Sequence, residues 1–157
     1  MSQQGFQPRG TLAGDLTQAT LPFIVSNAVT VTAGNAVTLV GGYLENIAST
    51  STTGVLGVAA ETVKGTSTSL TCAVHCDPNL VYYNTAETAL LITSVGKVFK
   101  AVTTSGKQYI SATSGAVNSA NHFIMLRRDP DDTGSTTAGL FKIYGGITFN
   151  KTLSGLE

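Results

Sequence analysis

Short segments in which apolar and polar residues alternate recur along most of this 157-residue chain, and turn-forming residues separate them. Strict alternation places one set of side chains on each face of a strand, so the pattern predicts β-structure. The expected strands are 28–32, 36–40, 43–48, 54–60, 70–76, 80–83, 95–102, 107–112, 123–127 and 139–144, with 147–149 as a further edge strand. About eight to ten short strands favour a single β-sandwich or small β-barrel.

Three pairs of neighbouring strands are expected to form hairpins. The pairs are 28–32 with 36–40, 95–102 with 107–112, and 123–127 with 139–144. In the first pair, Gly34 supplies a residue that tolerates positive φ between the strands. At most one short helix is expected, and residues 85–91 are the one place for it, because Ala, Glu and Leu cluster there behind Thr85 as a possible N-cap.

Residues 1–20 differ from the rest because they are polar, contain Gly and Pro, and carry few apolar side chains. Such a composition is too sparse to form its own core, so it predicts an extended N-terminal arm before a β-rich domain at 21–157. An arm with isolated apolar residues suits pairing with another subunit. We therefore expect Phe6, Arg9, Leu12 and Leu16 to contact a partner, the alternative being a frayed terminus.

Composition narrows the range of partners. Only 11% of residues are charged, and nine basic residues balance nine acidic ones. Without a basic stripe the chain is not expected to follow a phosphate backbone, so nucleic acid is excluded as a partner. No apolar run approaches the ~20 residues of a membrane span, and no secretory signal is recognisable, so we expect synthesis in a cytoplasm and no membrane contact.

The segment Cys72-x-x-His75-Cys76 is the main candidate for chemistry, as a zinc site or a thiol nucleophile. In a strand, however, both cysteines face one side and His75 the other, and His122 is the only further His or Cys. Four residues of strand also separate the cysteine Cα atoms by ~13 Å, which is beyond disulfide reach. We expect free thiols and no metal.

Two further motifs give no catalytic or cofactor site. The acidic loop with Asp129, Asp131 and Asp132 lacks the spacing of a calcium loop, and the neighbouring Arg127 and Arg128 favour a solvated turn. The glycines of segment 54–57 are not followed by Gly-Lys-Ser/Thr, so they do not form a phosphate loop. No nucleophile elbow is present. We therefore expect neither an enzyme nor a cofactor.

The order of these segments resembles the small auxiliary capsid proteins of tailed bacteriophages, known as decoration, cement or head-stabilising proteins. The resemblance covers roughly residues 25–90: a polar arm leads to segment 29–37, then to segment 54–61, then to a strand that ends at Asp77-Pro78 and precedes Tyr82-Tyr83. It implies a virion protein on the outer capsid surface, commonly a homotrimer, that holds neighbouring major-capsid subunits together. The arm residues would contact the capsid lattice.

A second function remains open from the residues themselves. β-Sandwiches often bind glycans through exposed aromatic side chains, and Tyr82, Tyr83 and Tyr109 are the candidates here. The alternative to capsid decoration is thus a receptor- or glycan-binding module of a phage tail or baseplate.

Overall fold

The computed structural model describes residues 5–12, 20–48, 54–111, 122–128 and 137–144. Within these ranges the chain forms fourteen β-strands and one 3₁₀ turn, Ile92–Ser94, without an α-helix. The prediction of an all-β fold is therefore confirmed. The fourteen strands outnumber the expected eight to ten because residues 7–11, 20–24 and 63–64 form strands that were not expected, and because segment 95–102 divides into two strands.

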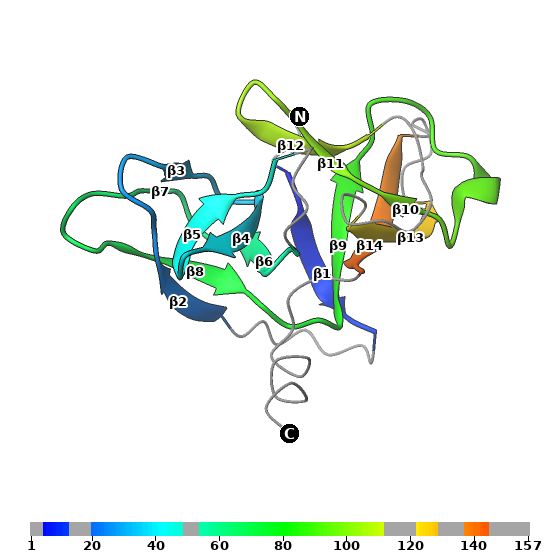
Figure 1. The fold of residues 1–157 in the computed structure, drawn as a ribbon. Helices are drawn as coiled ribbons and strands as arrows, with labels where there is room; N and C mark the ends of the chain where they lie inside the picture. The colour runs from blue at the N-terminus through cyan, green and yellow to red at the C-terminus, as the bar shows by residue number, and fades with distance from the viewer. Residues whose placement is uncertain (1–4, 13–19, 49–53, 112–121, 129–136, 145–157) are drawn as a thin grey trace.

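The main sheet contains five antiparallel strands in the order β1-β9-β14-β13-β10 (Figure 1). The strands are β1 (Gln7–Thr11), β9 (Leu80–Thr85), β14 (Ala138–Ile143), β13 (Phe123–Arg128) and β10 (Val98–Phe99). Directly opposite residues share a face of the sheet. Phe141 therefore lies beside Tyr82 and Met125 on the buried face, while Leu140 lies beside Tyr83 on the other.

The second five-stranded sheet has the order β2-β8-β6-β4-β5 and curls into a small barrel. Its strands are β2 (Thr20–Ile24), β8 (Thr71–His75), β6 (Gly57–Ala59), β4 (Ala36–Val40) and β5 (Tyr43–Asn46). A bridge between Val25 and Leu44 joins the two edges, and the Ser26 N–H donates to the Leu44 carbonyl at 3.0 Å. Beside this barrel, β3 (Thr30–Val31) pairs with β7 (Val63–Lys64).

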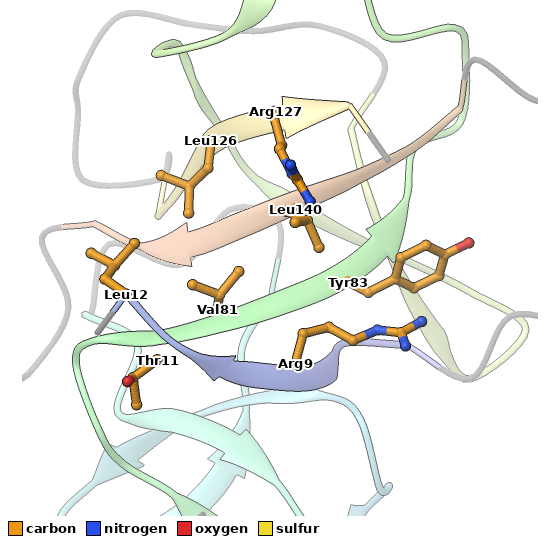
Figure 2. Close-up of a pocket in the computed structure, with 8 residues that line it drawn as sticks. All are labelled: Arg9, Thr11, Leu12, Val81, Tyr83, Leu126, Arg127 and Leu140. Carbon is orange, nitrogen blue, oxygen red and sulfur yellow. The ribbon is translucent and has the colours of Figure 1, made fainter. Parts of the chain in front are cut away.

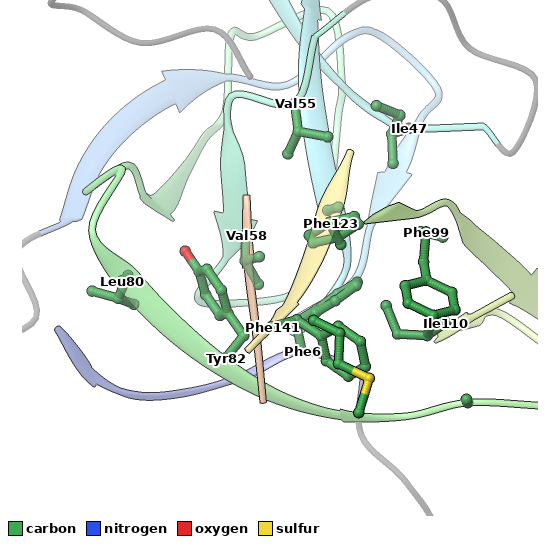
Figure 3. Packing of buried hydrophobic residues seen from close by; sticks show 14 of the residues in the cluster. Phe6, Ile47, Val55, Val58, Leu80, Tyr82, Phe99, Ile110, Phe123 and Phe141 are labelled. Atoms are coloured by element: carbon green, nitrogen blue, oxygen red, sulfur yellow. The ribbon is translucent and has the colours of Figure 1, made fainter. Parts of the chain in front are cut away.

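The barrel and the main sheet enclose two separate hydrophobic cores. The barrel is filled by small aliphatic side chains and one thiol: Val25, Val31, Val37, Leu44, Leu56, Ala59, Cys72 and Val74. The larger core lies under the main sheet and is rich in aromatic rings (Figure 3). Ala36 and Val58, on barrel strands, belong to this larger core, so the barrel wall presents apolar side chains to both cores.

A third unit, the hairpin of β11 (Ala101–Thr104) and β12 (Lys107–Ile110), is hydrogen-bonded to the barrel mainly through Gln108, and the Asn35 side chain adds a bond to the Gly106 carbonyl at 3.4 Å. The fully buried Gln108 carboxamide oxygen accepts the Ala36 N–H at 2.6 Å, and its nitrogen donates to the carbonyls of Ala36 at 3.4 Å and Ile47 at 3.2 Å. These bonds replace a strand ladder between the hairpin and β4. Both polar atoms of the buried Gln108 amide have hydrogen-bond partners. These bonds offset the cost of removing the amide from water.

The predicted hairpin of segments 28–32 and 36–40 is wrong. Gly34 does adopt φ +84°, but its N–H donates to the Ala59 carbonyl at 2.9 Å and its carbonyl accepts the Phe6 N–H at 2.7 Å. β3 pairs with β7, and β4 pairs instead with β5 and β6. The hairpin turn of β4 and β5 is Gly41-Gly42, whose φ angles of +58° and +88° suit a two-residue hairpin turn.

Residues 85–91, the one place where a short helix was allowed, form no helix, which agrees with the expectation of at most one. β9 continues through Thr85, which pairs with Ala138, and Ala86 bridges to Ile110. Leu90 then enters the larger core. Tertiary pairing therefore overrides the local helix preference of this segment.

The two other predicted hairpins are confirmed, and one predicted strand divides into two. Segment 95–102 divides into β10 and β11 because Lys100 turns away from β10 and its carbonyl accepts the Ser111 N–H at 2.9 Å. The hairpin of β11 with β12 and the pairing of β13 with β14 both form as expected. Segment 147–149 lies outside the described residues.

Candidate protein-interaction groove

The outer face of the main sheet is unusually apolar for a surface that no described strand covers. Val81, Leu126 and Leu140 on this face are half-buried, and Leu12 beyond β1 is 59% exposed. Together with Arg9, Thr11, Tyr83 and Arg127 they line an open groove of about 750 Å³ (Figure 2). Exposed apolar surface bordered by polar residues is typical of binding sites.

Two β-bulges shape this groove. On β1 the register with β9 shifts between Pro8 and Gly10, leaving Arg9 as the extra residue. On β13 the register with β14 shifts between Met125 and Arg127, leaving Leu126 as the extra residue. A bulge changes the direction of a side chain relative to regular alternation. Both bulge residues line the groove, so the two irregularities act on the same surface.

Arg9 is held in place by an aromatic ring. Its guanidinium carbon lies 4.9 Å from the centre of the Tyr83 ring, a distance at which a cation–π interaction is favourable. Figure 2 shows Arg9 beside Tyr83 and Arg127 pointing across Leu140, whereas Leu12, Val81 and Leu126 gather at the other end. The groove thus has an apolar end and an end that carries two guanidinium groups.

Charge is unevenly distributed between the two sheets, although the whole chain is neutral. The five strands of the main sheet carry four basic residues, Arg9, Arg127, Arg128 and Lys142, and no acidic residue. The described acidic residues, Glu45, Glu61, Asp77 and Glu87, all lie outside these strands. Arg9, Arg127 and Lys142, which pairs with Val81, lie on the outer face of the main sheet, so this face carries positive charge.

The four residues expected to contact a partner have different positions. Arg9 and Leu12 line the groove, and Leu16 lies outside the described residues. Phe6, in contrast, is 1% exposed and stacks on Phe123 with ring centroids 4.2 Å apart. The structure thus differs from the expectation of a separate arm for residues 5–12: this segment adds a strand to its own domain, and Phe6 is not accessible to a partner.

The cysteine and histidine segment does not converge into a site. Cys72 and Cys76 are free thiols that pack with the barrel core, whereas His75 pairs with Val58, a residue of the other core, as expected from alternation. Burial raises the pKa of the Cys76 thiol to about 11 and also raises the pKa of Cys72. A nucleophilic cysteine requires the opposite shift. Among the described residues, no group of three or more His, Cys, Asp or Glu side chains could hold a metal ion.

The aromatic candidates for glycan binding are also separated. Tyr82 is fully buried, and its hydroxyl donates to the His75 carbonyl at 3.4 Å. Tyr83 stacks beneath Arg9, and Tyr109 lies on the β11–β12 hairpin. The three rings therefore form no shared platform for a sugar. The acidic loop with Asp129, Asp131 and Asp132 lies outside the described residues.

Sequence reasoning missed Val81, Leu126, Arg127 and Leu140 as parts of a site. A signal was present, because β9, β13 and β14 each contain apolar residues at positions facing both sides of the sheet. A strand with one solvated face normally alternates. Apolar residues at both sets of positions thus indicate a second surface suited to contact.

In comparisons with known proteins, no protein-family model matches the chain, and no curated protein matches its sequence. In the described part of the chain, no helix has the length and hydrophobicity to cross a membrane.

Proposed function

We propose that this protein is a non-enzymatic structural module that uses the outer face of its main sheet to bind a larger protein assembly. The groove carries this proposal, because it combines exposed apolar side chains with two guanidinium groups. Arginine and aromatic residues are enriched where protein surfaces meet, and an exposed apolar patch bordered by polar residues marks an interaction surface. The raised pKa values of both thiols support a role without nucleophilic catalysis.

The assembly that we propose is the capsid of a tailed bacteriophage, with the major capsid protein and further copies of this chain as partners. The resemblance of residues 25–90 to decoration proteins supports this choice. Exposed apolar residues also occur away from the groove, at Leu91 just before the 3₁₀ turn, at Ile92 within it and at Tyr43 on the barrel. Separate contact surfaces suit a protein that touches several neighbours, as a clamp between capsid subunits does.

Quantitative mass spectrometry of purified particles of the encoding virus tests this function. A decoration protein should be present at a copy number on the same order as the major capsid protein. Absence from the particle, or presence at only a few copies, would contradict the proposal. The second of these outcomes would favour the alternative, a receptor- or glycan-binding component of the tail or baseplate.

A further inference from the structure

We infer that the groove recognises a protein segment in which an apolar side chain lies next to a carboxylate, that is, an acidic peptide with embedded aliphatic residues. This inference rests on the proposed function and specifies the chemistry of the partner. The shape of the groove gives the first argument. Leu12, Val81 and Leu126 form its apolar end, and Arg9 and Arg127 form the other (Figure 2).

Charge complementarity gives the second argument. The strands of the main sheet supply only basic charged residues, and none of the described residues that line the groove is acidic. A guanidinium group binds a carboxylate through two parallel hydrogen bonds, and such a bond is stronger beside an apolar surface than in open water. An apolar ligand without a carboxylate would form no such charge-assisted hydrogen bonds with Arg9 and Arg127.

Preorganisation gives the third argument. The bulge directs Arg9 onto the face of the sheet, and the Tyr83 ring holds the guanidinium at 4.9 Å. A long side chain that is already ordered loses less conformational entropy when it binds. Arg9 therefore has the properties of a fixed carboxylate receptor, in contrast to an unconstrained surface cation.

The same geometry disfavours nucleic acid in the groove. Single-stranded nucleic acid requires aromatic faces on which bases stack, together with a continuous track of cations. Arg9 covers one face of Tyr83, the aromatic side chain of the groove, and the aliphatic end offers nothing to phosphate groups. A protein segment uses both ends of the groove.

A methyl-detected NMR titration of the full chain tests this inference with three short, end-blocked peptides that differ in one residue type. The first alternates Leu with Asp, the second replaces Asp with Asn, and the third replaces Asp with Lys. We expect the Asp peptide to shift the methyl signals of Val81, Leu126 and Leu140 and to bind about tenfold more tightly than the Asn peptide, because only it forms charge-assisted bonds.

Arg9→Gln and Arg127→Gln should each weaken binding of the Asp peptide by about three- to tenfold, since each removes one charged partner. Both side chains are exposed, so these variants should retain the fold, which unchanged methyl spectra away from the groove would verify. Lys64→Gln is the control, because Lys64 is an exposed cation on β7, outside the main sheet. Its binding of the peptide should equal that of the unchanged protein.

Failure of the inference is distinguishable from failure of the proposed function. Equal affinity for the three peptides, no binding of the Asp peptide, shifts confined to other surfaces, or tighter binding of an oligo-dT probe at the same methyl groups would each overturn the inference. If the chain is nevertheless abundant on virus particles, the capsid function stands. Specific binding of the Asp peptide by a chain that is absent from particles would support the groove chemistry and overturn the capsid function.

Discussion

The barrel and the main sheet are built from similar short strands, yet they use their two faces differently. The barrel curls until its edges meet at Val25 and Leu44, so its inner side chains are enclosed by the sheet itself. The main sheet stays open and uses one face to cover the aromatic core. Its other face keeps Val81 and Leu140 half-exposed. Closure thus lets the barrel bury its inner apolar side chains against one another, whereas the open main sheet keeps apolar side chains on a face that can bind a partner.

The two regions also depend on different residues for their stability. The barrel core consists of small aliphatic side chains, and Gly57 allows close approach of its strands. The main sheet relies on interlocked rings: Phe6 stacks on Phe123 and meets Tyr82 edge-on, and Phe99 meets Phe141 edge-on. Substitutions made in one core at a time can therefore test whether the barrel and the main sheet depend on different residues.

The largest effect is expected from Phe6→Ala, which removes the ring that connects the N-terminal strand to the aromatic core. Loss of a fully buried phenylalanine should lower the free energy of unfolding by about 3–5 kcal/mol. Urea denaturation followed by far-UV circular dichroism measures this change. Leu12→Ala is the control, because its side chain is 59% exposed and should cost less than about 0.5 kcal/mol. Similar small losses in both variants would show that β1 is only loosely attached.

The position of Phe6 illustrates what could not be predicted from the sequence. The polar composition of residues 1–20 correctly indicates that they cannot form a core alone. It contains no information about where a single aromatic residue docks, because that depends on the Gly34 carbonyl and on Phe123, which are distant in the sequence. Local alternation was sufficient to predict that β13 pairs with β14, because the two strands are neighbours in the sequence.

A second effect is expected where the β11–β12 hairpin meets the barrel. Gln108→Leu should lower the free energy of unfolding by about 1–3 kcal/mol, because the buried Ala36 N–H and Ile47 carbonyl would lose their partners. Amide hydrogen exchange at Ala36 should accelerate in this variant. Thr104→Ala, at an exposed position of the same hairpin, should change neither quantity. Unchanged protection of the Ala36 amide in Gln108→Leu would contradict the role of the side chain as a strand substitute.

The groove was only partly predictable, and the reason is again physical. Arg9 and Leu12 were identified because they are distinct residues in a sparse segment. The other lining residues look like ordinary strand residues until the pairing of β9 with β14 places Tyr83 beside Leu140. Bulges are equally hidden, since the extra residues Arg9 and Leu126 are defined only by the partner strand.

A third prediction compares two glycines of the barrel. A Cβ atom on Gly57 would collide with the His75 backbone carbonyl, whereas one on Gly42 would meet nothing within 4 Å. Gly57→Ala should therefore force strands β6 and β8 apart and cost about 1–3 kcal/mol. Gly42→Ala should cost about 1 kcal/mol, from its φ of +88° alone. Thermal denaturation of both variants measures the difference, and an equal cost would argue against close packing as the reason for Gly57.

The smallest effect concerns the response of the barrel to alkaline pH. Burial raises the pKa of Cys76 from 9.0 to about 11 in the folded protein, so the unfolded chain loses this proton first as the pH rises. The thiol's contribution to stability is complete below pH 9.0 and is lost as the pH rises toward 11. Burial also raises the pKa of Tyr82, which therefore adds to the alkaline decline in stability.

Cys76→Ala should make this decline in stability shallower without abolishing it, as urea midpoints measured across this pH range would show. Because the thiol is only partly buried, we expect a modest change. An identical pH profile in the variant would mean that the barrel interior does not oppose ionisation of Cys76, and that its enclosure is less complete than the closed strand order indicates.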